Sequence, residues 1–243
     1  MSETRDREER RGGLAGAPAT AGASVAAPAP VSAGTLAAAP AAAAAVHEEA
    51  AFAQLWRAVE EAGFDCFGEV DAAALEVRDE VRDMCASGAC HQYGRNWACP
   101  PACGDLDAFR LIIGACSRGI VFQTVGVLED EFDGEAMMDA EALHKRRTEA
   151  LSDALAAAGL GAERCLVLSA GTCTRCKPCA YPEPCRFPGR RLVSMEAAGL
   201  LVTDACNAAG VPYNHGRFTI AYTGCALLRG SSPSDAAEPS SRV

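Results

Sequence analysis

The stretch Gly171-Thr172-Cys173-Thr174-Arg175-Cys176-Lys177-Pro178-Cys179, followed by Cys185, places four thiols in thirteen residues with the spacing C-x2-C-x2-C-x5-C. Thiols two residues apart in a tight loop can face one centre, and the thiolate is the form that binds soft metals. Ferredoxins hold a [4Fe–4S] cluster with a C-x2-C-x2-C run, whereas zinc sites usually add a second cysteine pair much farther along the chain. The run therefore favours one iron–sulfur cluster, with zinc as the alternative; its expected ligands are Cys173, Cys176, Cys179 and Cys185.

The charges around these thiols suit an anionic centre. The segment from Gly171 to Arg191, here called the late loop, contains a single acidic residue, Glu183. Its basic residues are Arg175, Lys177, Arg186, Arg190 and Arg191. The whole chain, by contrast, has a net charge of −10. Cations beside a four-thiolate cluster offset its negative charge and raise its reduction potential. The alternative is a disulfide-linked loop, but cysteines two residues apart rarely reach disulfide geometry.

Length and composition narrow the class of protein. A chain of 243 residues makes one domain or two small ones and can bury a core without disulfide support. Its 13 cysteines are clustered and odd in number, which indicates metal binding in a chain expected to be cytoplasmic. The acidic balance argues against a nucleic-acid partner. No uninterrupted apolar run is long enough for a membrane helix, so no membrane association is expected.

Composition divides the chain into three parts. Residues 1–46 begin with charges and continue with Ala, Pro, Gly, Ser and Thr, which bury too little apolar surface to offset ordering entropy, so a disordered Ala/Pro-rich tail is expected. Arg10-Arg11 followed by small residues resembles a twin-arginine export signal, but prolines interrupt its apolar part. Residues 47–229 are expected to form the metal-binding domain, and residues 230–243 a flexible C-terminal tail.

Hydrophobic periodicity predicts alternating helices and strands in the folded part. Phe52, Leu55, Trp56 and Val59 recur at i, i+3, i+4 and i+7, which is typical of a helix that Gly63 can end. Further helices are expected over 72–84, 105–115, 135–158 and 194–209, and strands over 64–70, 119–128, 164–170 and 217–228. The fold class is therefore α/β, with a mixed four-stranded sheet, flanking helices and two cysteine-rich metal-binding loops. Because helix, strand and cysteine loop recur in both halves, a pseudo-repeat is a hypothesis.

A second cysteine-rich segment, here called the early loop, runs from Cys85 to Cys103. It contains the pattern C-x4-C-x2-Y-G-x4-C-P-P, formed by Cys85, Cys90, Tyr93, Gly94, Cys99, Pro100 and Pro101. The later part contains G-x-C-x2-C-x2-C, then C-R and S-M-E-A, formed by Gly171, Cys173, Cys176, Cys179, Cys185, Arg186 and Ser194-Met195-Glu196-Ala197. In these two motifs and their order, residues 48–228 resemble the DUF2284 family of predicted metal-binding proteins. The domain expected over 47–229 is thus DUF2284-like.

The resemblance implies metal binding but no particular reaction, because the family itself is described by inference. The implied ligands are Cys85, Cys90, Cys99, Cys173, Cys176, Cys179 and Cys185. Val193 stands where the family has a proline and Leu201 where it has an aspartate, so any chemistry of that aspartate is missing from this chain. Cys103 lies outside the family pattern.

The early loop has two interpretations. Cys99-Pro100-Pro101 resembles the Cys-Pro step at ferredoxin ligands, and Gly88 and Gly94 permit a tight path that gathers thiols. Alternatively, its aromatic residues and prolines form a packed lid. If metal binds, the early three cysteines hold a second centre whose fourth position is an open iron, a substrate or Cys103, or the two loops exchange ligands.

Other reactive residues have simpler explanations. Five cysteines lie among apolar residues and are expected in the core: Cys66, Cys116, Cys165, Cys206 and Cys225. His144 is expected to face solvent, His215 to lie in a loop without a partner, and Met137-Met138 to be core. Glu196 is explained by the dipole of the helix expected at 194–209. No catalytic residue is identified.

These patterns predict a cytoplasmic iron–sulfur protein that carries one or two [4Fe–4S] clusters and exchanges electrons with an unidentified redox partner protein. Two alternatives remain. One is a zinc-stabilised binding module, in which the metal serves folding alone. The other is a redox enzyme or metal-delivery protein that works at an open iron of the early loop.

Overall fold

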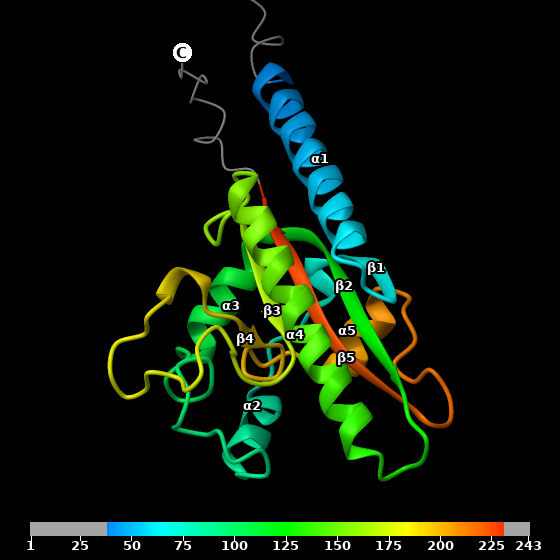
Figure 1. Cartoon of the computed structure of the whole chain (residues 1–243). Helices are drawn as coiled ribbons and strands as arrows, with labels where there is room; N and C mark the ends of the chain where they lie inside the picture. Colours follow the sequence, from blue (N-terminus) through cyan, green and yellow to red (C-terminus); the bar gives the residue numbers. More distant parts are fainter. Residues whose placement is uncertain (1–37, 231–243) are drawn as a thin grey trace, which may run out of the picture. The chain divides into compact units, whose positions relative to one another are not determined.

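A computed structural model describes residues 38–230, and a mixed five-stranded sheet forms the centre of this part of the chain (Figure 1). The strands stand in the order β1-β2-β5-β3-β4. Their bounds are β1 (Cys66–Asp71), β2 (Cys116–Val127), β3 (Cys165–Ser169), β4 (Val193–Ser194) and β5 (Thr219–Arg229). Neighbouring strands are antiparallel except β3 and β4, which are parallel. The α/β class and the mixed sheet are confirmed, and the predicted number of four strands is wrong.

Helices cover both faces of this sheet. The bounds are α1 (Ala38–Glu61), α2 (Asp79–Ala86), α3 (Leu106–Gly114), α4 (Gly134–Ala157) and α5 (Val202–Ala208), with short 3-10 turns η1 (Ala72–Ala74) and η2 (Pro188–Arg190). Helices α1 and α4 pack over β2 and β5 on one face (Figure 1). Ile120 and Phe122 of β2 join their core cluster, whereas Val121 joins the cluster that contains α3 and α5. Because successive side chains of a strand face opposite sides, α3 and α5 cover the other face.

Each cysteine loop lies in a connection between two neighbouring strands of the sheet. The early loop lies between the antiparallel strands β1 and β2, together with α2 and α3, and the late loop lies between the parallel strands β3 and β4. Figure 1 shows the early loop in teal and the late loop in yellow on the same side of the molecule. This connectivity brings residues far apart in the sequence next to each other. A duplication of the two halves stays a prediction.

The helix expected over 194–209 is wrong in its first half. Val193 and Ser194 form β4 instead, which pairs with Leu168 and Ser169 of β3. The Ser194 hydroxyl then accepts a hydrogen bond from the Ala197 amide, so the chain turns before α5 begins at residue 202. A two-residue strand shows no alternation that sequence periodicity could detect. The helix expected over 72–84 is likewise divided into η1 and α2.

The N-terminal helix extends farther than its apolar periodicity indicated. Helix α1 begins at Ala38, before the expected start of the domain at residue 47. Most of the predicted tail (residues 1–37, including Arg10-Arg11) and residues 231–243 lie outside the described part of the chain. Within residues 38–230, no helix is long and apolar enough to cross a membrane.

Candidate metal centre

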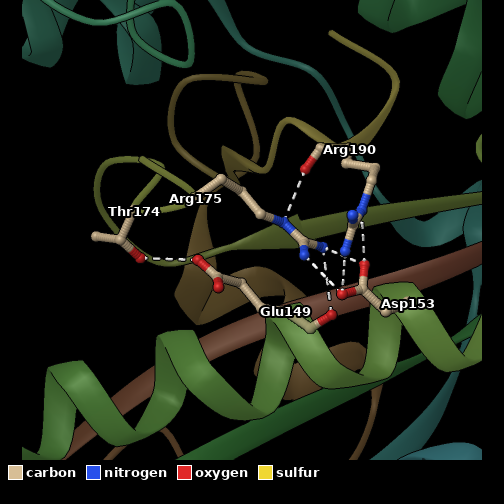
Figure 2. A network of polar contacts seen from close by, with 5 residues as sticks. All are labelled: Glu149, Asp153, Thr174, Arg175 and Arg190. Atoms are coloured by element: carbon tan, nitrogen blue, oxygen red, sulfur yellow. Dashed lines mark hydrogen bonds and ion pairs between the residues drawn. The ribbon is translucent and has the colours of Figure 1, made fainter. Parts of the chain in front are cut away.

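The late loop is held against α4 by a polar network (Figure 2). The Thr174 hydroxyl donates to a carboxylate oxygen of Glu149 at 2.9 Å. Arg175 donates from Nη1 to Asp153 at 2.7 Å and from Nη2 to the Glu149 carbonyl at 3.2 Å. Arg190, at the other end of the loop, binds the same Asp153 carboxylate, and its carbonyl accepts from Arg175 Nε at 3.1 Å. One carboxylate of α4 therefore joins the two ends of the late loop.

This network changes the interpretation of the local charge. Arg175 and Arg190 hold the pKa of Asp153 below its ordinary value, because both guanidinium groups bind that carboxylate. Asp153 neutralises part of the positive charge that the sequence suggested for an anionic centre. Arg186 donates instead to the Pro178 carbonyl at 3.1 Å. Arg191, together with Arg175, lines the cavity described next.

All four late cysteines line one small cavity of about 10 Å³. The cysteine side chains are half-buried. The complete lining is Asn96, Trp97, Cys173, Arg175, Cys176, Cys179, Cys185, Phe187 and Arg191. The late cysteines predicted as ligands are thus brought to a common cavity, which lies at the boundary between the two loops.

The early loop closes one side of this cavity by direct contact with the late loop. Asn96, which is only 5% exposed, donates from its amide to the Cys173 carbonyl at 3.5 Å. The Trp97 indole N–H donates to the Glu183 carbonyl at 2.7 Å, and its ring meets Tyr181 edge-on at 5.3 Å. These contacts fix the register of the loops, because each joins a residue of one loop to the backbone or ring of the other.

The early cysteines form a second neighbourhood of thiols. Cys85, in the last turn of α2, is half-buried, Cys90 is exposed and Cys99 is 8% exposed. Burial first, and then the neighbouring thiols of Cys90, Cys103, Cys85 and Cys179, raise the pKa of Cys99 to about 12. Because Cys179 is a late cysteine, the two sets of thiols adjoin. Because this raised pKa keeps the Cys99 thiol protonated in the absence of metal, ligation by Cys99 would release a proton.

Glu196 is a neighbour of this second group. Burial raises the pKa of the Cys85 thiol first, and the Glu196 carboxylate adds to that rise. The expectation that a helix dipole explains Glu196 is wrong, because residues 195–199 form a turn rather than a helix start. Glu196 thus contributes negative charge beside the early loop.

Cys103 is the most enclosed cysteine of the early loop, at 4% exposed. Arg82 of α2 donates from Nη2 to its sulfur and to the Gly104 carbonyl, both at 2.6 Å. Arg191 of the late loop donates to the Cys103 carbonyl at 3.3 Å. Burial raises the pKa of Cys103, and the two guanidinium groups oppose that rise. Sequence reasoning identified neither Arg82 nor Asn96, since neither belongs to a recognisable ligand pattern.

The donor set fits a soft metal or cluster. All 13 cysteines are free thiols, and no hydrogen bond to the sulfurs of the late four occurs within residues 38–230. In the same range, no three His, Cys, Asp or Glu side chains lie close enough to hold a single ion as they stand. Four thiols around one cavity, with guanidinium groups beside them, are the ligands and charges that an anionic iron–sulfur centre needs.

Four of the five cysteines expected in the core are buried there, namely Cys116, Cys165, Cys206 and Cys225, and Cys66 is half-buried against them. Three other expectations are wrong. His144 is fully buried, and burial lowers its pKa to about 3, while Met138 is 65% exposed. His215 has a partner after all, since its Nε2 lies 2.9 Å from the Gln123 carboxamide oxygen. These residues lie outside the two thiol groups.

Comparison with known proteins agrees with these motifs. The family model of DUF2284, described as a predicted metal-binding protein, matches residues 68–228. The match covers both cysteine loops and begins later than the resemblance at residue 48 suggested. No match was found among curated proteins or among solved structures.

Proposed function

The chain belongs to the DUF2284 family of predicted metal-binding proteins, and from this premise we propose that it is an iron–sulfur protein with an electron-transfer role. Cys173, Cys176, Cys179 and Cys185 hold a [4Fe–4S] cluster, which supplies one-electron chemistry when bound. The observation that carries the proposal is the cavity these four thiols share. The redox partner is a protein not identified by any feature of the site.

The residues around the cavity support a redox centre. Trp97 and Phe187 supply apolar walls that limit water at the thiols, and solvent exposure is one determinant of cluster potential. Arg191 supplies a positive charge that stabilises the more negative, reduced state. The contacts of Thr174 and Arg175 with α4 fix the loop that carries the thiols. These side chains orient and enclose the centre.

A second centre is proposed on the early loop, with Cys85, Cys90 and Cys99 as ligands. Their thiols are mutual neighbours, and Cys179 of the late loop lies beside Cys99. The exposure of Cys90 favours one alternative, in which a substrate or a metal acceptor reaches an open iron there. The other alternative is zinc, which would serve folding alone.

Purification without oxygen followed by iron, zinc and acid-labile sulfide analysis tests the proposal. We expect brown protein whose visible absorption bleaches with dithionite, and iron and sulfide in equal amounts. Colourless protein that contains stoichiometric zinc would contradict the iron–sulfur proposal. The variant Cys176→Ala/Cys179→Ala should lose the late centre, whereas the matched variant Cys206→Ala, changed at a buried core cysteine, should keep it.

A further inference from the structure

Cys103 is placed by the backbone in the same turn as the proposed ligand Cys99. Its amide donates to the Cys99 carbonyl at 3.0 Å, a contact between residues four apart. This hydrogen bond closes residues 99–103 into a single turn and brings the backbones of the two cysteines together. Both residues are nearly buried, at 8% and 4% exposed. The path of the chain therefore brings a fourth thiol to the early three.

The surroundings of the early thiols agree with this placement. The thiols of Cys85, Cys90 and Cys103 lie close enough to Cys99 to interact with it electrostatically. Those of Cys90 and Cys103 interact in the same way with Cys85. Cys103 is thus within electrostatic range of the two buried or half-buried thiols of the group. Four thiolates are the usual protein ligand set of a [4Fe–4S] cluster.

The hydrogen bonding of Cys103 differs from that of a cysteine that serves only the core. Cys116 is buried similarly, and its sulfur faces the carbonyls of Ile112 and Leu227, which accept from a thiol. The Cys103 sulfur also faces a carbonyl, that of Gly104 at 3.8 Å, but in addition it accepts a hydrogen bond from Arg82, whose guanidinium is always charged. This charged donor is a partner that the sulfur of Cys116 lacks.

Arg82 also carries an unused donor. Its Nε is buried and has no hydrogen-bond partner within residues 38–230. A buried donor without a partner is costly, whereas sulfur atoms of a bound centre are acceptors. The unpartnered Nε belongs to the same guanidinium that binds the Cys103 sulfur. A sulfur atom of a centre bound next to Cys103 would give this Nε an acceptor.

We propose that Cys103 is the fourth protein ligand of the early centre, with Cys85, Cys90 and Cys99, and that Arg82 is a positioning residue that holds its sulfur. The inference rests on the proposed function, since it requires that the early loop binds a metal centre. It gives the early centre a complete thiolate set, without an open iron. The family pattern, from which Cys103 is absent, assigns it no such role.

The test compares three serine variants of the full chain: Cys103→Ser, Cys99→Ser and the control Cys116→Ser. Each is loaded with iron and sulfide without oxygen, its fold is checked by circular dichroism, and iron per chain and the electron paramagnetic resonance spectrum after reduction are measured. We expect Cys103→Ser to lose the same iron and the same signal as Cys99→Ser, while Cys116→Ser matches the unchanged protein. Iron content and spectrum of Cys103→Ser equal to those of Cys116→Ser would overturn the inference.

A second variant covers the case in which Cys103→Ser does not fold. Arg82→Gln keeps the sulfur and removes its guanidinium, so the early signal should shift and the late signal should not. An unchanged early signal in Arg82→Gln would overturn the inference. Failure of the proposed function is distinct, because the unchanged protein would then contain no iron at all.

Discussion

The early and the late loop adjoin the same cavity but are held there by different interactions. The early loop is an extension of the core, with Ala98, Cys99 and Cys103 all buried. The four late cysteines are only half-buried, and their loop is fixed largely by the contacts of Thr174 and Arg175 with α4. The difference indicates that apolar burial orders the early loop with the core. The order of the late loop depends on ion pairs and, under the proposed function, on the cluster that its thiols hold.

The largest expected effect is that of metal removal on the late loop. A ligand present at a thousand times its dissociation constant stabilises the folded state by about 4 kcal/mol. In a chain of this size, each kcal/mol corresponds to roughly 2–4 °C in melting temperature. Chelator-treated protein should therefore melt roughly 8–16 °C lower, as measured by circular dichroism. Limited proteolysis should cut the late loop first, and equal sensitivity of both loops would contradict the comparison.

A smaller effect is expected from Asp153→Asn, which removes the carboxylate that joins the two ends of the late loop. Arg175, whose side chain is only 8% exposed, loses its ion pair, while the Asp153 side chain itself is 39% exposed. A buried pair is worth several kcal/mol when one partner is removed and an exposed pair less than about 1 kcal/mol. We expect a loss of about 2 kcal/mol in urea unfolding, and Asp139→Asn, an exposed residue on the same helix, should have no effect.

The same ion pairs predict a pH dependence. The folded-state pKa of Asp153 is lowered, so its contribution is fully present above the ordinary carboxyl pKa and is lost as the pH falls through the lowered value. The difference in stability between the unchanged protein and Asp153→Asn should therefore shrink in acid. Urea unfolding at a series of acidic pH values measures it. A difference that stays constant down to strong acid would exclude a role of the carboxylate charge.

How far the sequence predicts this arrangement depends on how local each signal is. The cysteine runs predict which thiols act as ligands, because the spacing typical of ligands is contained within a few residues. The convergence of Asn96 and Cys173 depends on strand order, which no local pattern encodes. The helix expected over 194–209 failed for a related reason. Met195 and Leu200 are spaced from later apolar residues as they would be in a helix. The structure instead buries them in the segment that follows β4, so tertiary packing overrides helix propensity there.

The smallest expected effect comes from a change at the contact between the early and the late loop. Trp97→Phe removes the hydrogen bond to the Glu183 carbonyl while keeping an aromatic ring against Tyr181. The matched control is Trp56→Phe, because Trp56 is also half-buried, donates to Glu60 at 2.9 Å and meets Phe67 edge-on at 5.4 Å. Each change should cost about 1 kcal/mol of global stability, the usual net worth of one hydrogen bond.

The two tryptophan variants should differ in which part of the molecule loses stability. Trp97→Phe should accelerate hydrogen exchange at the late-loop amides and the release of iron to a chelator, since Glu183 is no longer held to the early loop. Trp56→Phe, whose indole bonds within α1, should leave both rates unchanged. If the two variants release iron at the same rate, the loops open independently of each other. The early loop would then cover the late thiols without holding them.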